Sequence, residues 1–192
     1  RIHVLGNAQH AEMIRHNLES LLVQLEEITR LEDRIASETR EMKDLQKLDS
    51  PEATKKISEL EQAQQQNSGQ LQQLAQEGMK TLREALRNPA FNEDTLMDWT
   101  RNLSQMQKLA QQQMKEAAQS LQAAAQSKSQ TEREEKLGEA QQKEEETLQA
   151  LQQMQQKVNQ GLDELQALTL AQRLRQLGDR EKKIESTLHT NI

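Results

Sequence analysis

The four histidines are the first residues to consider as metal ligands. They lie toward the two ends of the chain, at His3, His10, His16 and His189. A helical zinc site typically takes two histidines at i and i+4 with a further ligand nearby. The spacings here are seven and six residues, and the chain has no cysteine to add a thiolate. The sequence therefore predicts surface histidines and no metal site.

Two acidic runs have the residue types that paired carboxylates need for general acid–base chemistry. They are Glu132, Glu134 and Glu135, and Glu144, Glu145 and Glu146. A catalytic pair requires a pocket that shifts one of the two pKa values, and a thin helical rod offers no obvious cleft. We interpret both runs as solvated helix faces and expect Glu144→Ala to be nearly silent. With no Gly-rich phosphate loop and no nucleophile–histidine arrangement, the sequence predicts no enzyme, no catalytic residue and no cofactor-binding residue.

One basic cluster stands out against the net charge of −6. It consists of Arg173, Arg175, Arg180, Lys182 and Lys183. Such a cluster can meet an acidic partner or anionic lipid. The acidic residues Asp179, Glu181 and Glu185 lie among the basic ones and favour a mixed, solvated surface instead. The acidic balance of the whole chain argues against nucleic acid as a partner.

The composition is that of long helices. Of 192 residues only 33% are hydrophobic and 1% aromatic, with six glycines and two prolines. Gln, Leu, Glu and Ala dominate, and these residues lose little on entering a helix. Apolar residues recur three and four apart, which is the heptad pattern of helices that pack along a narrow seam. We expect an all-α fold: an elongated up-down bundle of four long helices in antiparallel coiled-coil hairpins.

The first predicted hairpin spans residues 1–87, with helices over about 8–48 and 51–87. Ser50 or Asp49 is expected to cap the second helix, with Pro51 at its first position, where the missing N–H costs nothing. The seam of the first helix is carried by Ile14, Leu18, Leu21, Leu25, Ile28, Ile35 and Met42. The seam of the second helix is carried by Ile57, Leu60, Gln64, Asn67, Leu71, Leu74, Leu82 and Leu86, with Gly78 or Met79 between the last leucines.

Folding the chain back at about residue 49 places polar seam residues of both helices at one height. Gln64 and Asn67 come near Glu32 and Ile35. One interpretation is a polar layer that fixes the register of the helices at some cost in stability. The alternative is a layer that is solvated because the helices splay apart.

The corner at residues 88–99 contains the only Phe and the only Trp. Asn92 is predicted to be the N-cap of the next helix, with Phe91 and Leu96 forming a hydrophobic staple across it. Pro89 disfavours helix at the residue before it and so ends the preceding helix.

The second predicted hairpin spans residues 88–192. Its helices are expected over 93–126 and 132–177, with Thr131 capping the latter. Gly178–Asp179 is expected to break the chain before a short helix over 180–189. The stripe of the third helix includes Ala110, Gln113 and Ala117, and Leu109 and Met114 widen it; the stripe of the fourth helix includes Glu144. Helix 132–177 is longer than its neighbour, so residues beyond about 165 must pair with the N-terminal region, another subunit or a partner.

The residues around the corner also carry a resemblance. Leu82–Leu96 is followed by Trp99, then by Leu103–Ala110 and Ala117–Leu121. Over about residues 82–151 this sequence resembles a large bacterial family of membrane-anchored, Gln/Glu-rich helical proteins of unknown function. Members are encoded beside MoxR-type AAA+ ATPases and von Willebrand factor A-domain proteins. The resemblance implies a cell-envelope location on the periplasmic side, an anchor outside this sequence, and no catalytic residue.

Together these observations predict a non-catalytic structural or protein-interaction module, a spacer or docking rod within a larger bacterial protein. The chain begins with Arg1 rather than Met, so we expect a piece of a longer protein. The alternative is a peripheral membrane binder that uses amphipathic helices, which vesicle co-sedimentation would detect. Partners are expected to be proteins or further copies of the chain, and a cytoplasmic location is the alternative to the envelope.

Overall fold

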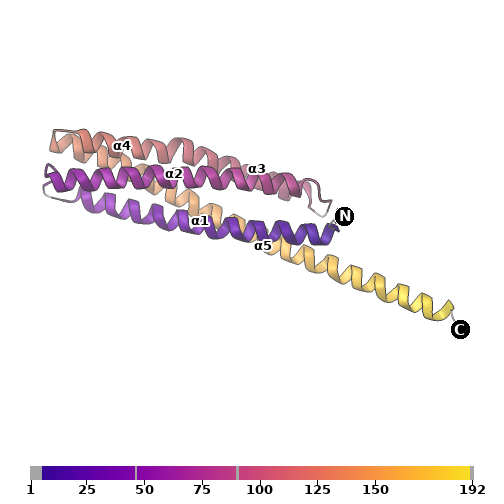
Figure 1. The fold of residues 1–192 in the computed structure, drawn as a ribbon. Coiled ribbons are helices and arrows are strands. Elements are labelled where there is room, and N and C mark those ends of the chain that lie inside the picture. Colours follow the sequence, from indigo (N-terminus) through magenta and orange to yellow (C-terminus); the bar gives the residue numbers. More distant parts are fainter. Residues whose placement is uncertain (1–5, 46, 90, 191–192) are drawn as a thin grey trace, which may run out of the picture.

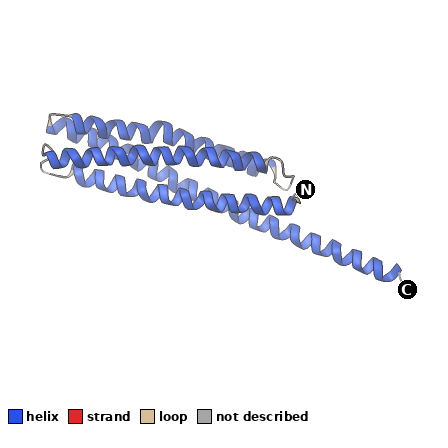
Figure 2. Ribbon diagram, in the orientation of Figure 1, coloured by secondary structure: helices blue, strands red, loops and turns tan. Residues whose placement is uncertain are grey.

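The protein is all-α. The computed structural model describes residues 6–45, 47–89 and 91–190, apart from the side chains of residues 172, 176 and 184–190. Within this part of the chain every regular element is a helix and no strand occurs (Figure 2). The elements are α1 (Asn7–Lys43), α2 (Pro51–Ala85), α3 (Glu93–Lys108), the π-helical turn η1 (Leu109–Gln113), α4 (Met114–Gln126) and α5 (Gln130–Thr190). The predicted all-α bundle class is confirmed.

The helices form one elongated bundle (Figure 1). α3, η1 and α4 follow one another without a break and act as a single rod, so the bundle has four long members. α1 contacts α2 and α5, and α4 also contacts α2 and α5, which closes the bundle around a shared core. α5 extends well past the other helices at the end where α1 begins (Figure 1).

Local signals place the two turns that the sequence predicts best. The Ser50 hydroxyl accepts a hydrogen bond from the Ala53 amide at 3.1 Å, with Pro51 at the first helical position. Asn92 Oδ1 accepts from the Thr95 amide at 2.7 Å and caps α3. Phe91 is buried against Trp99, with ring centroids 5.6 Å apart. Both caps satisfy amides that have no partner inside the helix, and both predictions are confirmed.

The core is made of apolar seams divided by a polar layer. Toward the turns after α1 and α4 lie Ile35, Met42, Leu48, Ala53, Ile57, Leu60, Leu121, Ala124, Leu137 and Ala140. In the middle lie Leu25, Ile28, Leu71, Leu74, Ala75, Leu82, Leu103, Met106, Leu109, Ala110, Met114, Leu151 and Met154. At the corner lie Ala11, Ile14, Ala85, Phe91 and Leu165. Within these groups, Leu25 and Ile28 of α1 lie with Leu71 and Leu74 of α2, and Met42 of α1 lies with Ile57 of α2.

α5 differs most from its prediction. It begins at Gln130, before the predicted cap Thr131, and runs without a break through Gly178 and Asp179 to Thr190. A glycine that ends a helix usually takes a positive φ, and no glycine among the described residues does so. Glycine inside a helix costs only about 1 kcal/mol, which the chain tolerates here. The prediction of a separate helix over 180–189 is therefore wrong.

Two further helices end earlier in the sequence than predicted. α1 ends at Lys43, and Leu48 is buried within the turn that follows. α2 ends at Ala85, so Leu86 is 63% exposed rather than part of the seam. The N-terminal region covers the start of the long overhang of α5, because Leu165 packs with Ala11 and Ile14.

Candidate functional site

The polar layer that divides the core is buried. Glu32 of α1 and Gln64 and Asn67 of α2 are all 0% exposed. Gln64 Nε2 donates to both carboxyl oxygens of Glu32, at 3.0 and 3.2 Å. Asn67 Nδ2 donates to Glu32 Oε2 at 2.7 Å. The layer predicted from the seam positions is confirmed in its buried form, and the splayed, solvated alternative is wrong.

A second carboxyl group is buried on the facing helix. Glu144 of α5 is 0% exposed, and its Oε1 accepts a hydrogen bond from Thr39 Oγ1 of α1 at 3.1 Å. The interpretation of Glu144 as part of a solvated acidic face is therefore wrong. Its neighbour Glu146 is exposed, as predicted. The helix periodicity places Glu144 on the seam. This position on the apolar stripe, rather than the charge of the acidic run, decides that its side chain is buried.

The layer has more hydrogen-bond acceptors than donors. Within the described residues, Gln64 Oε1, Asn67 Oδ1 and Glu144 Oε2 are buried and receive no hydrogen bond. A buried polar atom without a partner costs on the order of 1–3 kcal/mol. Protonation of a carboxyl group converts one acceptor into a donor and reduces this imbalance. The geometry thus favours bound protons in the layer.

The pKa values follow from the same environment. Burial raises the pKa of Glu32 to about 7, against the opposing hydrogen bonds from Gln64 and Asn67. Burial also raises the pKa of Glu144 to about 8, with a further contribution from the charge of Glu32. Removal from water disfavours the charged form of a carboxyl group. Both groups therefore change charge near neutral pH.

The charged groups around the layer are engaged at the surface. Arg40 of α1 pairs with Glu145 of α5 at 2.6 Å. Lys143 of α5 pairs with Glu116 of α4 at 3.0 Å. Among the described residues, the hydrogen bonds to Glu32 and Glu144 come from neutral side chains, and neither carboxyl group has an ion pair with a cation. Complete burial leaves the two carboxyl groups without contact with solvent in this conformation.

The π-helical turn η1 lies beside the layer. Its extra residue widens one helical turn, and Ser68 Oγ of α2 donates to the Ala110 carbonyl there at 2.8 Å. The turn also changes the phase of the helix. Met114 is fully buried and Gln113 is half-buried, so the predicted stripe position of Gln113 is wrong. Turns of this kind occur frequently at functional sites, and sequence periodicity alone does not identify them.

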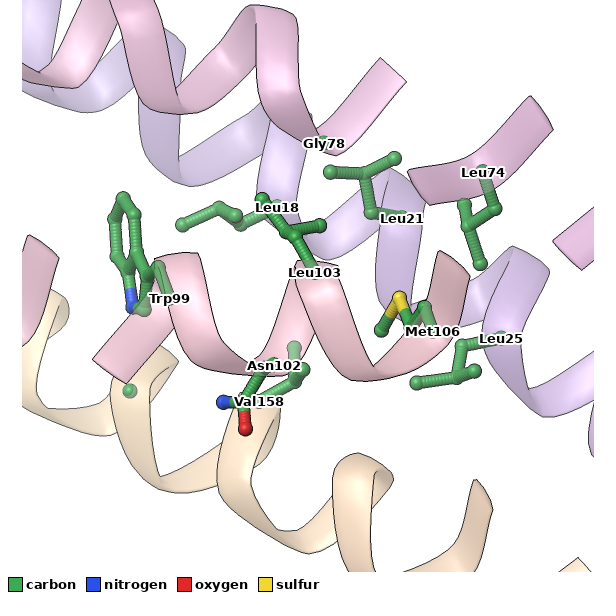
Figure 3. Close-up of a pocket in the computed structure, with 11 residues that line it drawn as sticks. Leu18, Leu21, Leu25, Leu74, Gly78, Trp99, Asn102, Leu103, Met106 and Val158 are labelled. Atoms are coloured by element: carbon green, nitrogen blue, oxygen red, sulfur yellow. The ribbon is translucent and has the colours of Figure 1, made fainter. Parts of the chain in front are cut away.

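An apolar gap lies near the corner, between α1, α2, α3 and α5 (Figure 3). Leu18, Leu21, Leu25, Leu74 and Met106 are among the side chains around it, and its volume is about 40 Å³. Gly78 gives α3 room to approach, because a Cβ there would overlap Leu103 Cδ2. A cavity this small and apolar has too few polar groups to hold water firmly. We interpret it as a packing gap rather than a ligand site.

Arg133 is buried although it lies in a charged run, which the sequence pattern does not predict. It is 6% exposed. Its guanidinium donates to the carbonyl oxygens of Ala124 at 2.9 Å and Ser127 at 2.6 Å, and also to that of Leu48. These bonds cap the C-terminal end of α4 and tie it to the turn between α1 and α2. Arg133 therefore joins both turns at one end of the bundle.

The histidines form no metal site within the described residues. His10 lies 3.8 Å from Glu84 Oε2, and His16 is exposed on the surface of α1. No group of three or more histidine, aspartate and glutamate side chains in the described part is arranged to hold a metal ion. His3 and the side chain of His189 lie outside the described residues.

The last part of α5 presents apolar side chains to solvent. We define residues 170–190 as the α5 projection. Leu170, Leu174 and Leu177 are 53%, 63% and 56% exposed, although they follow seam spacing. The buried stripe of α5 ends with Leu165 and Thr169. The stripe that begins with Leu170 is shifted in phase from the buried one and continues in sequence to Ile184 and Leu188, whose side chains lie outside the described residues.

The basic cluster lies on the same projection. Its members Arg173, Arg175, Arg180, Lys182 and Lys183 are exposed, as the mixed-surface interpretation predicts. Arg173 pairs with Glu12 of α1 at 3.4 Å, near the point where α5 leaves the bundle. Apolar and basic side chains thus share the part of α5 that extends past the bundle.

Comparisons of the chain with protein-family models, with curated proteins and with solved structures gave no match. None of the described helices combines the length and the apolar character needed to cross a membrane.

Proposed function

We propose that this chain is a non-catalytic interaction module: a closed helical bundle that presents the α5 projection as a docking helix. The observation that carries the proposal is the exposure of Leu170, Leu174 and Leu177 at seam spacing on a helix that extends past the bundle. Contiguous exposed apolar surface on a soluble domain typically marks an interaction site.

The bundle is suited to hold such a helix in a fixed direction. α5 is continuous from Gln130 to Thr190, so the same helix is part of the core and part of the projection. Arg133 and the polar layer link α5 to the turns and to α1. Polar seam residues fix the register and the partners of packed helices at a cost in stability. A support of this kind favours a spacer or docking rod over an enzyme.

The resemblance of residues 82–151 adds a setting to the proposal. A membrane-anchored bacterial parent protein would hold this module at the cell envelope, with the projection available to other proteins there. The coiled-coil and scaffold character of the module belongs to the same proposal.

A second candidate function is binding to a membrane surface. The basic residues beside the exposed leucines of the α5 projection favour it, because basic amphipathic helices bind anionic lipid. Co-sedimentation with vesicles that contain anionic lipid tests it directly. Binding that depends on both anionic lipid and Leu174 supports this candidate over protein docking.

Site-specific photo-crosslinking tests the main proposal. A crosslinking amino acid is placed at Leu177 of the parent protein in its own cells, and at exposed Gln111 of the bundle as a control. The expected result is a discrete protein adduct at position 177 that Leu174→Asp removes, and no adduct at position 111. Lack of any adduct at position 177 would refute docking through the projection.

A further inference from the structure

We propose that the α5 projection docks an acidic amphipathic helix of a partner protein. This inference rests on the proposed function and specifies the partner's chemistry. The projection carries five basic residues, at 173, 175, 180, 182 and 183, and three acidic ones, at 179, 181 and 185. Its net charge is therefore +2, whereas the whole chain carries −6. A helix with apolar residues on one face and acidic residues beside them complements this surface.

The spacing of the exposed leucines specifies a helical partner. Leu170, Leu174 and Leu177 are separated by four and three residues and are all more than half exposed. This is the narrow seam of a two-helix contact, in which leucines insert between side chains of the facing helix. Arg173 and Arg180 each lie one residue before a seam position and therefore flank the seam. Residues at such flanking positions determine which helix is accepted.

The same charges disfavour a second copy of the chain on this face. In an antiparallel pair of projections, the row that holds Arg173 and Arg180 faces the same row of the other copy. In a parallel pair, Glu181 at a seam position faces Glu181, and this repulsion inside the seam outweighs the exposed pairing of Arg180 with Glu185 of the other copy. Like charges in contact destabilise either arrangement. Elsewhere on the described surface the large exposed apolar residues are dispersed, at Met13, Val23, Leu45, Leu86 and Met97, so the bundle of a second copy offers no matching stripe.

A membrane surface fits the projection less well than a helix does. Interfacial helices commonly insert Trp or Phe together with leucine. The only Trp and Phe of this chain, Trp99 and Phe91, pack against each other in the bundle. Glu181 also occupies a seam position, where contact with the lipid interior would require removing a carboxylate from water.

The test uses the full chain and two synthetic helical peptides of four heptads. Both have leucine at the seam positions, one with glutamate and the other with lysine at the flanking positions. Fluorescence anisotropy is expected to show binding of the acidic peptide on the order of tenfold tighter than the basic one, and weaker at high salt. Leu174→Asp and Leu177→Asp are expected to abolish binding. Arg180→Glu is expected to reduce the preference for the acidic peptide.

Two matched variants separate docking from a general change of surface. Val23→Asp and Leu86→Asp place the same charge at exposed apolar positions on the bundle and are expected to leave peptide binding unchanged. Circular dichroism and size-exclusion chromatography verify that every variant keeps its fold. All mutated positions of the projection are exposed, so loss of binding with an unchanged fold reports on docking.

Four outcomes overturn the inference. They are equal or tighter binding of the basic peptide, loss of binding in Val23→Asp, a dimer that Leu174→Asp dissociates while neither peptide binds, and sedimentation with anionic vesicles while neither peptide binds. If these occur while the adduct at position 177 still forms in cells, docking stands and the acidic partner is wrong. If the adduct is missing as well, the proposed function fails.

Discussion

Asn67 of α2 bridges two groups of α1 through a single nitrogen atom. Its Nδ2 donates to Glu32 Oε2 at 2.7 Å and to the Ile28 carbonyl oxygen at 3.2 Å. These acceptors belong to residues one helical turn apart. A slip of α2 along α1 by one turn breaks both bonds and leaves a buried carboxyl group with fewer donors. The relationship gives the polar layer its specificity for one register.

Asn67→Ala is expected to destabilise the protein by about 2 kcal/mol, because buried acceptors lose their donor. The loss is expected to be larger at pH 9 than at pH 5, since the ionised form of Glu32 depends most on the amide donors. Urea denaturation at both pH values measures it. Gln66→Ala changes an exposed neighbour and is the control. An equal loss at both pH values would contradict the assigned role.

Stability is expected to fall as pH rises from 5 to 9. Glu32 and Glu144 have raised pKa values, about 7 and about 8, against an ordinary value of 4.5. The folded state therefore holds more protons than the unfolded chain above pH 4.5. Their stabilising contribution is complete below that pH and is lost as pH rises through 7 and 8. The free energy of unfolding is expected to drop by roughly 3 kcal/mol or more.

Glu144→Gln provides the matched test of that pH dependence, because an amide of similar shape cannot ionise. At pH 9 the variant is expected to exceed the wild type in stability by about 2 kcal/mol, and at pH 5 to lie within about 1 kcal/mol of it. Glu135→Gln, at an exposed position, is expected to follow the wild type. A gain in the stability of the wild-type protein from pH 5 to pH 9 would contradict the predicted ionisation of the layer.

Gly78 and Gly69 lie on the same helix and predict opposite responses to alanine. Gly69 has open space around its Cα, so Gly69→Ala is expected to stabilise α2 by about 0.5–1 kcal/mol. A methyl group at Gly78 overlaps Leu103. Gly78→Ala is therefore expected to give a free energy of unfolding at least about 1 kcal/mol lower than that of Gly69→Ala. Thermal unfolding of the two variants compares them. The difference is expected to shrink when Leu103→Ala is combined with Gly78→Ala.

Arg133→Met is expected to cost about 3 kcal/mol, because three carbonyl oxygens lose a charged donor. Hydrogen exchange is expected to increase in the two turns, residues 44–50 and 127–129, which hold the carbonyl oxygens of Leu48 and Ser127. Arg87→Met removes an arginine that is 73% exposed in its ion pair with Glu84 and is expected to change stability by less than about 1 kcal/mol. Unchanged exchange in both turns of the Arg133 variant would rule out its tethering role.

The turns were predictable because their signals are local. Ser50, Pro51, Phe91 and Asn92 act on residues within one helical turn of themselves, so the sequence alone identifies them. The polar layer was predictable for a related reason. A short turn fixes which residues of α1 and α2 lie opposite each other, and Glu32, Gln64 and Asn67 interrupt the seams at one height.

Glu144 and Arg133 were not predictable in the same way. Each is charged and lies in a charged run, and burial depends on the helix that packs above it. Arg133 is buried because its acceptors, such as Leu48, are far away in sequence. The π turn was missed because a single extra residue between Ala110 and Met114 changes the helix phase without any marked change in composition. The burial of Arg133 and the π turn depend on tertiary contacts, which periodicity does not reveal. Periodicity does place Glu144 on the seam, and the acidic run around it favoured the wrong interpretation.

The continuity of α5 has a mechanical consequence. Glu144 and Leu177 belong to one helix without a break and are separated by roughly 50 Å at 1.5 Å per residue. The exposed end of the helix and the buried carboxyl group are therefore joined by an unbroken run of backbone hydrogen bonds. A change in the direction of the projection would then require α5 to bend or Glu144 to shift against α1.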